Sequence, residues 1–149
     1  MKLIIGNDHA GVNIKNALVK HLTEKGYEVT DMGVGLGEKC HYPEMAEKVA
    51  AKVANGEYEK GILICGTGIG MSMAANKVKG IRAAVVSDYF SAKYTRVHND
   101  ANILCMGERV VGEGTAIELC DVFLNTEFDT ENPRHKQRID IITEIENRN

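Results

Sequence analysis

The chain contains 149 residues, 44% of them hydrophobic and 26% charged, and this length and composition predict a single globular domain over residues 1–149. Its formal net charge of −3 provides no basic surface, so we expect neither nucleic acid nor a membrane as a partner. The first residues have the pattern of a strand rather than a secretory leader, and no apolar run approaches the ~20 residues that a membrane span requires. The four cysteines lie far apart, without a C-x-x-C pair, so we expect reduced thiols and a cytoplasmic location.

Short apolar runs alternate with amphipathic segments along the whole chain. In chain order, the apolar runs predict strands at 2–6, 28–31, 61–65, 81–86 and 103–106. Apolar residues with helical spacing predict helices at 13–25, 43–54, 70–77, 87–97 and 114–124, and a last helix near 133–147. We therefore expect an α/β fold: a Rossmann-like three-layer α/β/α sandwich with a five-stranded parallel sheet and a C-terminal helix.

A glycine-rich turn, Cys65-Gly66-Thr67-Gly68-Ile69-Gly70, follows the third predicted strand and opens a helix. Such a turn directs backbone N–H groups to one point near the positive end of a helix, where a phosphate, a carboxylate or a transient oxyanion can bind. The spacing matches neither a Walker A loop nor the G-x-G-x-x-G dinucleotide fingerprint. The alternative interpretation is a tight structural turn beside an inert cysteine.

The position of Cys65 favours a chemical role for its thiol. A helix N-terminus lowers the pKa of a thiol toward ~7 and so makes the thiolate available as a base or nucleophile. Cys105 also ends a predicted strand, but no glycine loop follows it. We expect Cys105, Cys40 and Cys120 to be core residues.

Two further segments carry acid–base candidates. Asp8 and His9 follow the first predicted strand, at the carboxyl edge where open α/β sheets bind ligands, although such a pair can also form a helix-capping turn. His98 and Asn99 follow the fourth helix between strands. Imidazole titrates near neutral pH, so His98 is a candidate acid or base, whereas the alternative is a C-cap with Asn99 in the left-handed conformation.

Arginines at the start of the last helix predict an anion site. Arg134 and Arg138 are four residues apart and share one face of the first two turns. Cations at the positive end of a helix need a compensating anion, which a phosphate would provide through bidentate hydrogen bonds. The alternative is a solvated basic face balanced by Glu131. Arg109, after the fifth strand, is a third candidate for binding the anion.

Several ordered segments together resemble ribose-5-phosphate isomerase type B, a family grouped with the galactose-6-phosphate isomerase subunits. They are NDHAG at 7–11, CGTGIG at 65–70, AANK at 74–77, GIRA at 80–83, HNDAN at 98–102 and GERVVG at 107–112, followed by Arg134-His135-x-x-Arg138. The resemblance covers essentially the whole chain. It implies a metal-free, cofactor-free interconversion of ribose 5-phosphate and ribulose 5-phosphate through an enediolate.

The resemblance also implies a role for each matched residue. Cys65 is the base that moves a proton between C2 and C1, and His98 opens the furanose ring near Asp8. The resemblance assigns oxyanion stabilisation to the backbone of Gly66, Thr67, Gly68, Ile69 and Gly70, with help from the Thr67 side chain. It assigns phosphate binding to His9, Arg134 and Arg138. Asn99 and Arg109 would complete the pocket. The family further implies a homodimer or homotetramer whose pocket is shared between subunits. On this basis we expect His98, Asn99 and Arg109 to reach across from the partner.

One departure leaves the substrate open. His41 precedes Tyr42-Pro43, where the family often has aspartate, in a loop that the resemblance places near the sugar. A six-carbon substrate, allose 6-phosphate or galactose 6-phosphate, is therefore the nearest alternative.

A non-catalytic phosphate- or nucleotide-binding module on the same fold is the alternative from another functional class, but it would have no use for Cys65 or His98. A thiol-redox protein would need a resolving cysteine near Cys65, which is absent.

Overall fold

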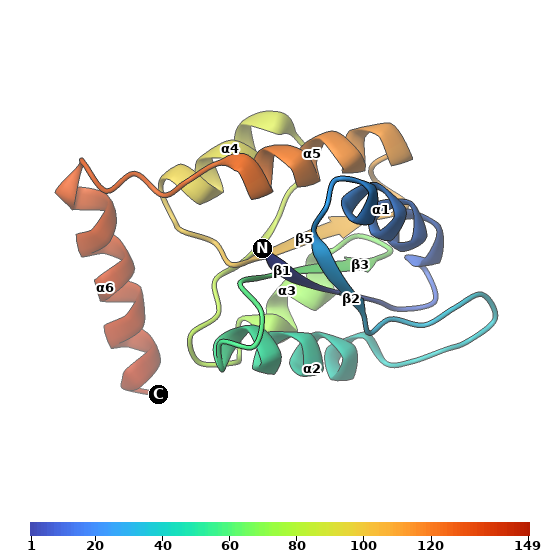
Figure 1. The fold of residues 1–149 in the computed structure, drawn as a ribbon. Coiled ribbons are helices and arrows are strands. Elements are labelled where there is room, and N and C mark those ends of the chain that lie inside the picture. Colours follow the sequence, from blue (N-terminus) through green and yellow to red (C-terminus); the bar gives the residue numbers. More distant parts are fainter.

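A computed structural model describes all 149 residues and has the expected alternation of strands and helices. Its elements are β1 (Lys2–Asn7), α1 (Val12–Glu24), β2 (Glu28–Asp31), α2 (Tyr42–Ala54), β3 (Lys60–Cys65), α3 (Ile69–Ala75), β4 (Ala83–Val85), α4 (Tyr89–Val97), β5 (Ile103–Gly107), α5 (Glu113–Asn125) and α6 (Pro133–Asn147) (Figure 1). The largest difference from the sequence prediction is β4, which is shorter than the predicted 81–86. Before it, the Arg82 N–H bonds to the Asn102 side chain instead of a neighbouring strand.

The five strands form one parallel sheet in the order β2-β1-β3-β5-β4. This order differs from the flavodoxin-like order, in which the fifth strand would lie at the edge. Here β4 is the edge strand and β5 pairs directly with the central β3, with Cys65 opposite Gly107. The carboxyl ends of β1, β3 and β5 therefore lie side by side.

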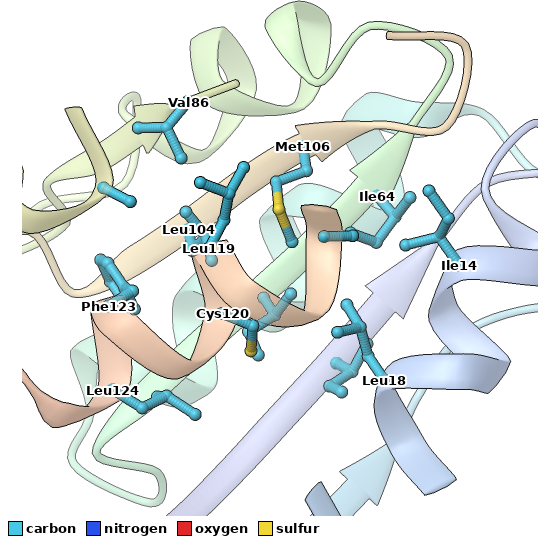
Figure 2. Close-up of a cluster of buried hydrophobic side chains, with 14 of the residues drawn as sticks. Ile14, Leu18, Ile64, Val86, Leu104, Met106, Leu119, Cys120, Phe123 and Leu124 are labelled. Carbon is cyan, nitrogen blue, oxygen red and sulfur yellow. The ribbon is translucent and has the colours of Figure 1, made fainter. Parts of the chain in front are cut away.

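Helices cover both faces of the sheet, as the sequence predicted. α1, α4 and α5 pack on one face, where Leu18, Leu104 and Phe123 belong to one buried cluster (Figure 2). α2 and α3 pack on the other face over a second cluster that includes Leu63 and Val49. Burying one such aliphatic side chain contributes about 1.5–3 kcal/mol. The two cores hold the sheet between the two helical layers and so fix the positions of its strand ends.

The last helix, α6, stands apart from the two layers (Figure 1). It begins where predicted, because the Asn132 side chain accepts a hydrogen bond from the Arg134 N–H at 3.1 Å and Pro133 occupies the first turn. Ile141, Ile142 and Ile145 on this helix are each about half exposed, at 52%, 48% and 47%. A cavity of about 990 Å³ lies between the end of α6 and the β4 side of the sheet. No helix in the structure combines the length and the apolar character that crossing a membrane would require.

Candidate functional site

The glycine-rich turn lies at the carboxyl edge of the sheet, between the ends of β3 and β5. Gly68 caps α3 in the left-handed conformation, with φ +81°. A Cβ atom on Gly107 would lie 2.5 Å from the Thr67 Cα, so the end of β5 can approach the turn only because Gly107 has no side chain. The backbone N–H groups of Gly66, Thr67 and Gly70 make no hydrogen bond within the chain. The turn therefore presents unused donors for an anion.

Cys65 is the last residue of β3, and its side chain faces the α2–α3 layer. Its sulfur accepts a hydrogen bond from the Gly68 N–H at 3.1 Å. Thr67 is exposed, and its hydroxyl accepts the Ile69 N–H at 3.2 Å, so that N–H is not free for a ligand in this arrangement. The thiol thus sits inside the turn, beside the unused donors.

The other cysteines have different surroundings. Burial raises the pKa of the Cys105 and Cys120 thiols far above the ordinary value, and both residues are fully buried, as expected of core residues. Cys40 is only half-buried and packs against the core from the loop after β2. Burial is also the main cause that raises the pKa of the Cys40 thiol, followed by the nearby Asp8 carboxylate.

Asp8 and His9 follow β1 at the same edge. The Asp8 N–H donates to the Ile64 carbonyl at 3.2 Å, which places Asp8 beside the end of β3. The buried Asp8 carboxylate accepts the Ala10 N–H at 2.9 Å and so closes a local turn, but the N-cap of α1 is Gly11 without a side-chain cap, so Asp8 does not cap the helix. The His9 side chain is exposed.

Arg109 lies against the glycine turn of its own chain. Its N–H donates to the Gly66 carbonyl at 3.1 Å, and its Nη1 is 3.2 Å from where a Cβ of Gly66 would be. The preceding Glu108 donates its N–H to the Cys65 carbonyl at 2.9 Å and accepts the Ile14 N–H of α1 at 2.7 Å. Because β5 neighbours β3, Arg109 lies beside the glycine turn of its own chain and not beside His98; its contribution to a partner's pocket stays a prediction.

Two residues that the sequence analysis did not select also belong to this edge. A Cβ on Gly70 would overlap the ring of Tyr42, so the aromatic ring lies directly against the glycine turn. Buried Asn7 exchanges two hydrogen bonds of 3.1 Å with Val34, which fixes the loop after β2 next to the end of β1. A polar residue at the end of an apolar strand was the signal for Asn7. The position of Tyr42 depends on how α2 packs against α3.

His98 and Asn99 lie at the amino edge of the sheet, where the strands begin, opposite the carboxyl edge. They follow α4, whose nine residues run back from the carboxyl edge over about 13 Å. The residue in the left-handed conformation is Asp100, with φ +46°, so the expectation for Asn99 is wrong. Arg82 donates to the Asn99 and Asp100 carbonyls at 3.1 and 3.0 Å, and Arg96 bonds the Asp100 carboxylate at 2.7 Å. These two arginines hold the turn in place.

The arginines of α6 lie next to the edge of the sheet that carries His98 and Asn99. Arg134 and Arg138 are both exposed on the first turns of α6. Between them, His135 stacks on the ring of His98 with a centroid distance of 4.7 Å. A groove of about 300 Å³ runs from His98 along α4 to Val85 of the edge strand β4.

The candidate residues thus form two separate clusters within one chain. The carboxyl-edge cluster consists of Asp8, His9, Cys65, the turn 66–70 and Arg109. The α4–α6 cluster consists of His98, Asn99, Arg134 and Arg138. The structure contains no group of three or more His, Cys, Asp or Glu side chains arranged to hold a metal ion.

Comparison with known proteins identifies relatives over the whole chain. Residues 3–142 match the family described as Ribose/Galactose Isomerase. The chain is 48% identical to ribose-5-phosphate isomerase B of Escherichia coli over 147 residues, which are 99% of this chain and 97% of that protein. Ribose-5-phosphate isomerase B of Clostridium thermocellum superimposes with a TM-score of 0.96 at 49% identity over 99% of both chains. The Mycoplasma genitalium enzyme with bound ribulose 5-phosphate superimposes with a TM-score of 0.93 at 40% identity, over 99% of this chain and 97% of that one. The chain therefore belongs to the ribose/galactose isomerase family.

Proposed function

We propose that this protein interconverts ribose 5-phosphate and ribulose 5-phosphate by moving one proton between C2 and C1 through an enediolate. The observation that carries the proposal is the Cys65 thiol placed inside a turn whose Gly66, Thr67 and Gly70 N–H groups are unused. An aldose–ketose isomerase needs one base beside one oxyanion site, and this turn supplies both.

The reaction steps follow from this arrangement. The Cys65 thiolate removes the C2 proton of the open-chain aldose, and negative charge develops on the carbonyl oxygen at C1. The free N–H groups of the turn stabilise that charge, each contributing about 2.7–4 kcal/mol in comparable oxyanion sites. The hydroxyl proton on the C2 oxygen passes to the C1 oxygen, and the thiol returns the abstracted proton to C1, which yields the ketose. The side chain of Thr67 assists, and no step needs a metal or a cofactor.

The α4–α6 cluster of another subunit supplies the groups that the remaining steps need. Its His98 opens the furanose ring, its Arg134 and Arg138 bind the phosphate, and its Asn99 helps to close the pocket. The carboxyl-edge cluster contributes Asp8 near the ring, His9 to the phosphate and Arg109 to the pocket. In one chain, His98 and Cys65 lie at opposite edges of the sheet, so they can act on one sugar only when they belong to different copies.

A homodimer accounts for this separation. An isologous two-fold contact places the α4–α6 cluster of each copy against the carboxyl-edge cluster of the other, and thereby forms two equal pockets. Exposed apolar residues on α3, β4, α4 and α6 are available for such a contact: Met73, Val85, Phe90, Ile141, Ile142 and Ile145. A homotetramer would be a pair of these dimers.

The five-carbon sugar is the proposed substrate because the structural relative from Mycoplasma genitalium holds ribulose 5-phosphate. The loop that carries His41 is fixed beside the carboxyl-edge cluster by Asn7, and it is the segment that would distinguish five-carbon from six-carbon substrates. A cytoplasmic location is part of the proposal, since a thiol that acts as a base must stay reduced.

A coupled assay of the purified protein tests the proposal. We expect kcat/KM on ribose 5-phosphate to exceed that on allose 6-phosphate and galactose 6-phosphate, and to be unchanged by EDTA. A preference for either six-carbon sugar would assign the protein to that substrate. If the folded protein binds ribose 5-phosphate but turns over none of the three sugars, it is a binding module. Cys65→Ala provides the background rate.

A further inference from the structure

We propose that His135 is a positioning residue for His98, which it holds by ring stacking from α6. The inference rests on the proposed role of His98 in opening the sugar ring. The two imidazoles are nearly parallel, with an interplanar angle of 25° and a centroid distance of 4.7 Å. Offset stacking of flat rings at this distance is stabilising and restricts how each ring can rotate.

His98 depends on this contact because little else holds its ring. It lies at the C-cap of α4, its side chain is exposed, and no hydrogen bond within the chain involves either ring nitrogen. Its other ring neighbour is Tyr94, one helical turn earlier, at 5.0 Å and 47°. The imidazole of His98 is therefore held between Tyr94 and His135 by packing alone.

His135 is itself fixed, as a positioning residue must be. It is buried, with only 9% of its surface exposed, although its neighbours on α6 are exposed. Its Nε2 lies 3.5 Å from the Asp129 carboxylate, and Asp129 bonds the Val97 carbonyl through its own N–H at 3.1 Å. Asp129 thus ties His135 to the end of α4, one residue before His98.

The buried Nδ1 of His135 has no hydrogen-bond partner in the chain. Leaving a buried nitrogen without a hydrogen-bond partner is destabilising. A residue chosen only to fill this space would be apolar and would avoid that cost. A flat ring that packs on His98 and also reaches Asp129 explains why a histidine stands here.

The same helix carries the proposed phosphate ligands. Arg134 precedes His135 directly and Arg138 follows one turn later. When both arginines bind the phosphate, α6 and His135 are fixed together with the substrate. The ring-opening histidine is then aligned by the helix that binds the far end of the same sugar.

The test separates ring opening from proton transfer. Ribose 5-phosphate is cyclic and must be opened, whereas ribulose 5-phosphate is an open chain because its 5-hydroxyl is esterified. We expect His135→Leu to lower kcat on ribose 5-phosphate about tenfold to a hundredfold, since misplacing a reacting group by about 1 Å has an effect of this size. KM should stay within about twofold, and the exchange of the C1 proton of ribulose 5-phosphate in D2O should stay close to wild type.

Two variants complete the design. His135→Phe keeps a flat ring and should retain at least about a third of the wild-type kcat, which distinguishes stacking from imidazole chemistry. Gln137→Ala, on the exposed face of the same helix, should leave every rate unchanged. If His135→Leu does not fold, His135→Phe and Asp129→Asn are compared with wild type in the same two assays.

The inference is overturned if folded His135→Leu opens ribose 5-phosphate at the wild-type rate, or if it loses proton exchange to the same extent. A His135→Phe variant as impaired as the leucine variant would equally exclude stacking as the cause. His98→Asn is measured in parallel. If His98→Asn itself keeps ring opening, the proposed function of His98 is wrong, whereas loss in His98→Asn with none in His135→Leu rejects only the role of His135.

Discussion

Cys65 differs from the other cysteines in what contacts its sulfur. The Gly68 N–H points at the Cys65 sulfur from 3.1 Å, while the Cys105 and Cys120 thiols are fully buried and have raised pKa values. A thiol beside backbone donors can carry a negative charge during a reaction, but one surrounded by aliphatic side chains cannot.

Replacing Cys65 should therefore remove proton transfer and leave substrate binding. We expect Cys65→Ala and Cys65→Ser to lower kcat by at least about a hundredfold, since a general base contributes 10²–10⁴. The measurement is kcat by coupled assay, together with ribose 5-phosphate binding by calorimetry. Cys120→Ala is the control, because it removes a remote buried thiol and should lower stability without affecting kcat. An alanine variant at position 65 with more than about a hundredth of wild-type kcat would exclude Cys65 as the base.

Arg134 and Arg138 should contribute to substrate affinity rather than turnover. A charge-assisted hydrogen bond contributes about 1.5–3 kcal/mol, so each alanine variant should raise KM for ribose 5-phosphate about tenfold or more. Turnover of unphosphorylated ribose should hardly change. Lys136→Ala is the matched control, because Lys136 lies between the two arginines but pairs with Asp140 at 2.7 Å. Equal losses on both sugars would mean that the arginines serve the fold or an interface instead.

At the scale of elements, the strand order determines the shape of the anion site. β5 lies next to β3, so the bare backbone of Gly107 can pack under the turn while Arg109 covers it. The turn itself depends on Gly68, which caps α3 at φ +81°. β3, β5 and α3 thus meet at the turn that carries the free N–H donors.

Gly68→Ala tests this convergence. The new methyl group would lie 2.8 Å from the backbone of Met106, in a conformation that costs an L-residue about 1–2 kcal/mol. We expect a lower midpoint in denaturant and a loss of kcat larger than any change in KM, because the donors are displaced from the oxyanion. Gly114→Ala is the matched control: nothing lies within 4 Å of its Cβ position, its φ is not positive, and it lies inside α5, so it should be neutral or slightly stabilising. Wild-type kcat in Gly68→Ala would show that the turn does not stabilise the reaction.

At the scale of the whole molecule, the two clusters lie at opposite edges of a three-layer domain. α4 separates them by its length, and α6 extends away from the layers with half-exposed isoleucines (Figure 1). A single copy would leave each cluster open to water, although an enediolate is better stabilised in a preorganised site from which water is excluded. Assembly is therefore part of the proposed chemistry.

Mixing two inactive variants tests for a shared pocket. Cys65→Ala and His98→Asn proteins are combined and their subunits allowed to exchange. In each heterodimer one pocket then contains an intact Cys65 from one chain and an intact His98 from the other, so activity should return to about one working pocket per mixed dimer. Subunit exchange is verified by mass spectrometry. No recovery after demonstrated exchange would show that each pocket is built within one chain.

The sequence alone predicted the class of fold and the placement of Cys65 beside the glycine turn. Alternating apolar runs and amphipathic segments specify βα units locally, because each period reflects which side chains face the core. Cys65 and the glycine turn are adjacent in the sequence, so their proximity needed no tertiary information. The family resemblance, carried by ordered motifs, was confirmed over residues 3–142.

Only the tertiary structure decided which candidates lie together. The order β2-β1-β3-β5-β4 results from packing between distant segments, and it places Arg109 on Gly66 rather than beside His98. The separation of His98 from Cys65 follows from the direction in which α4 runs across the sheet, and the stacking of His135 on His98 follows from where α6 begins. These relations join residues that are dozens of positions apart, and local periodicity carries no information about them.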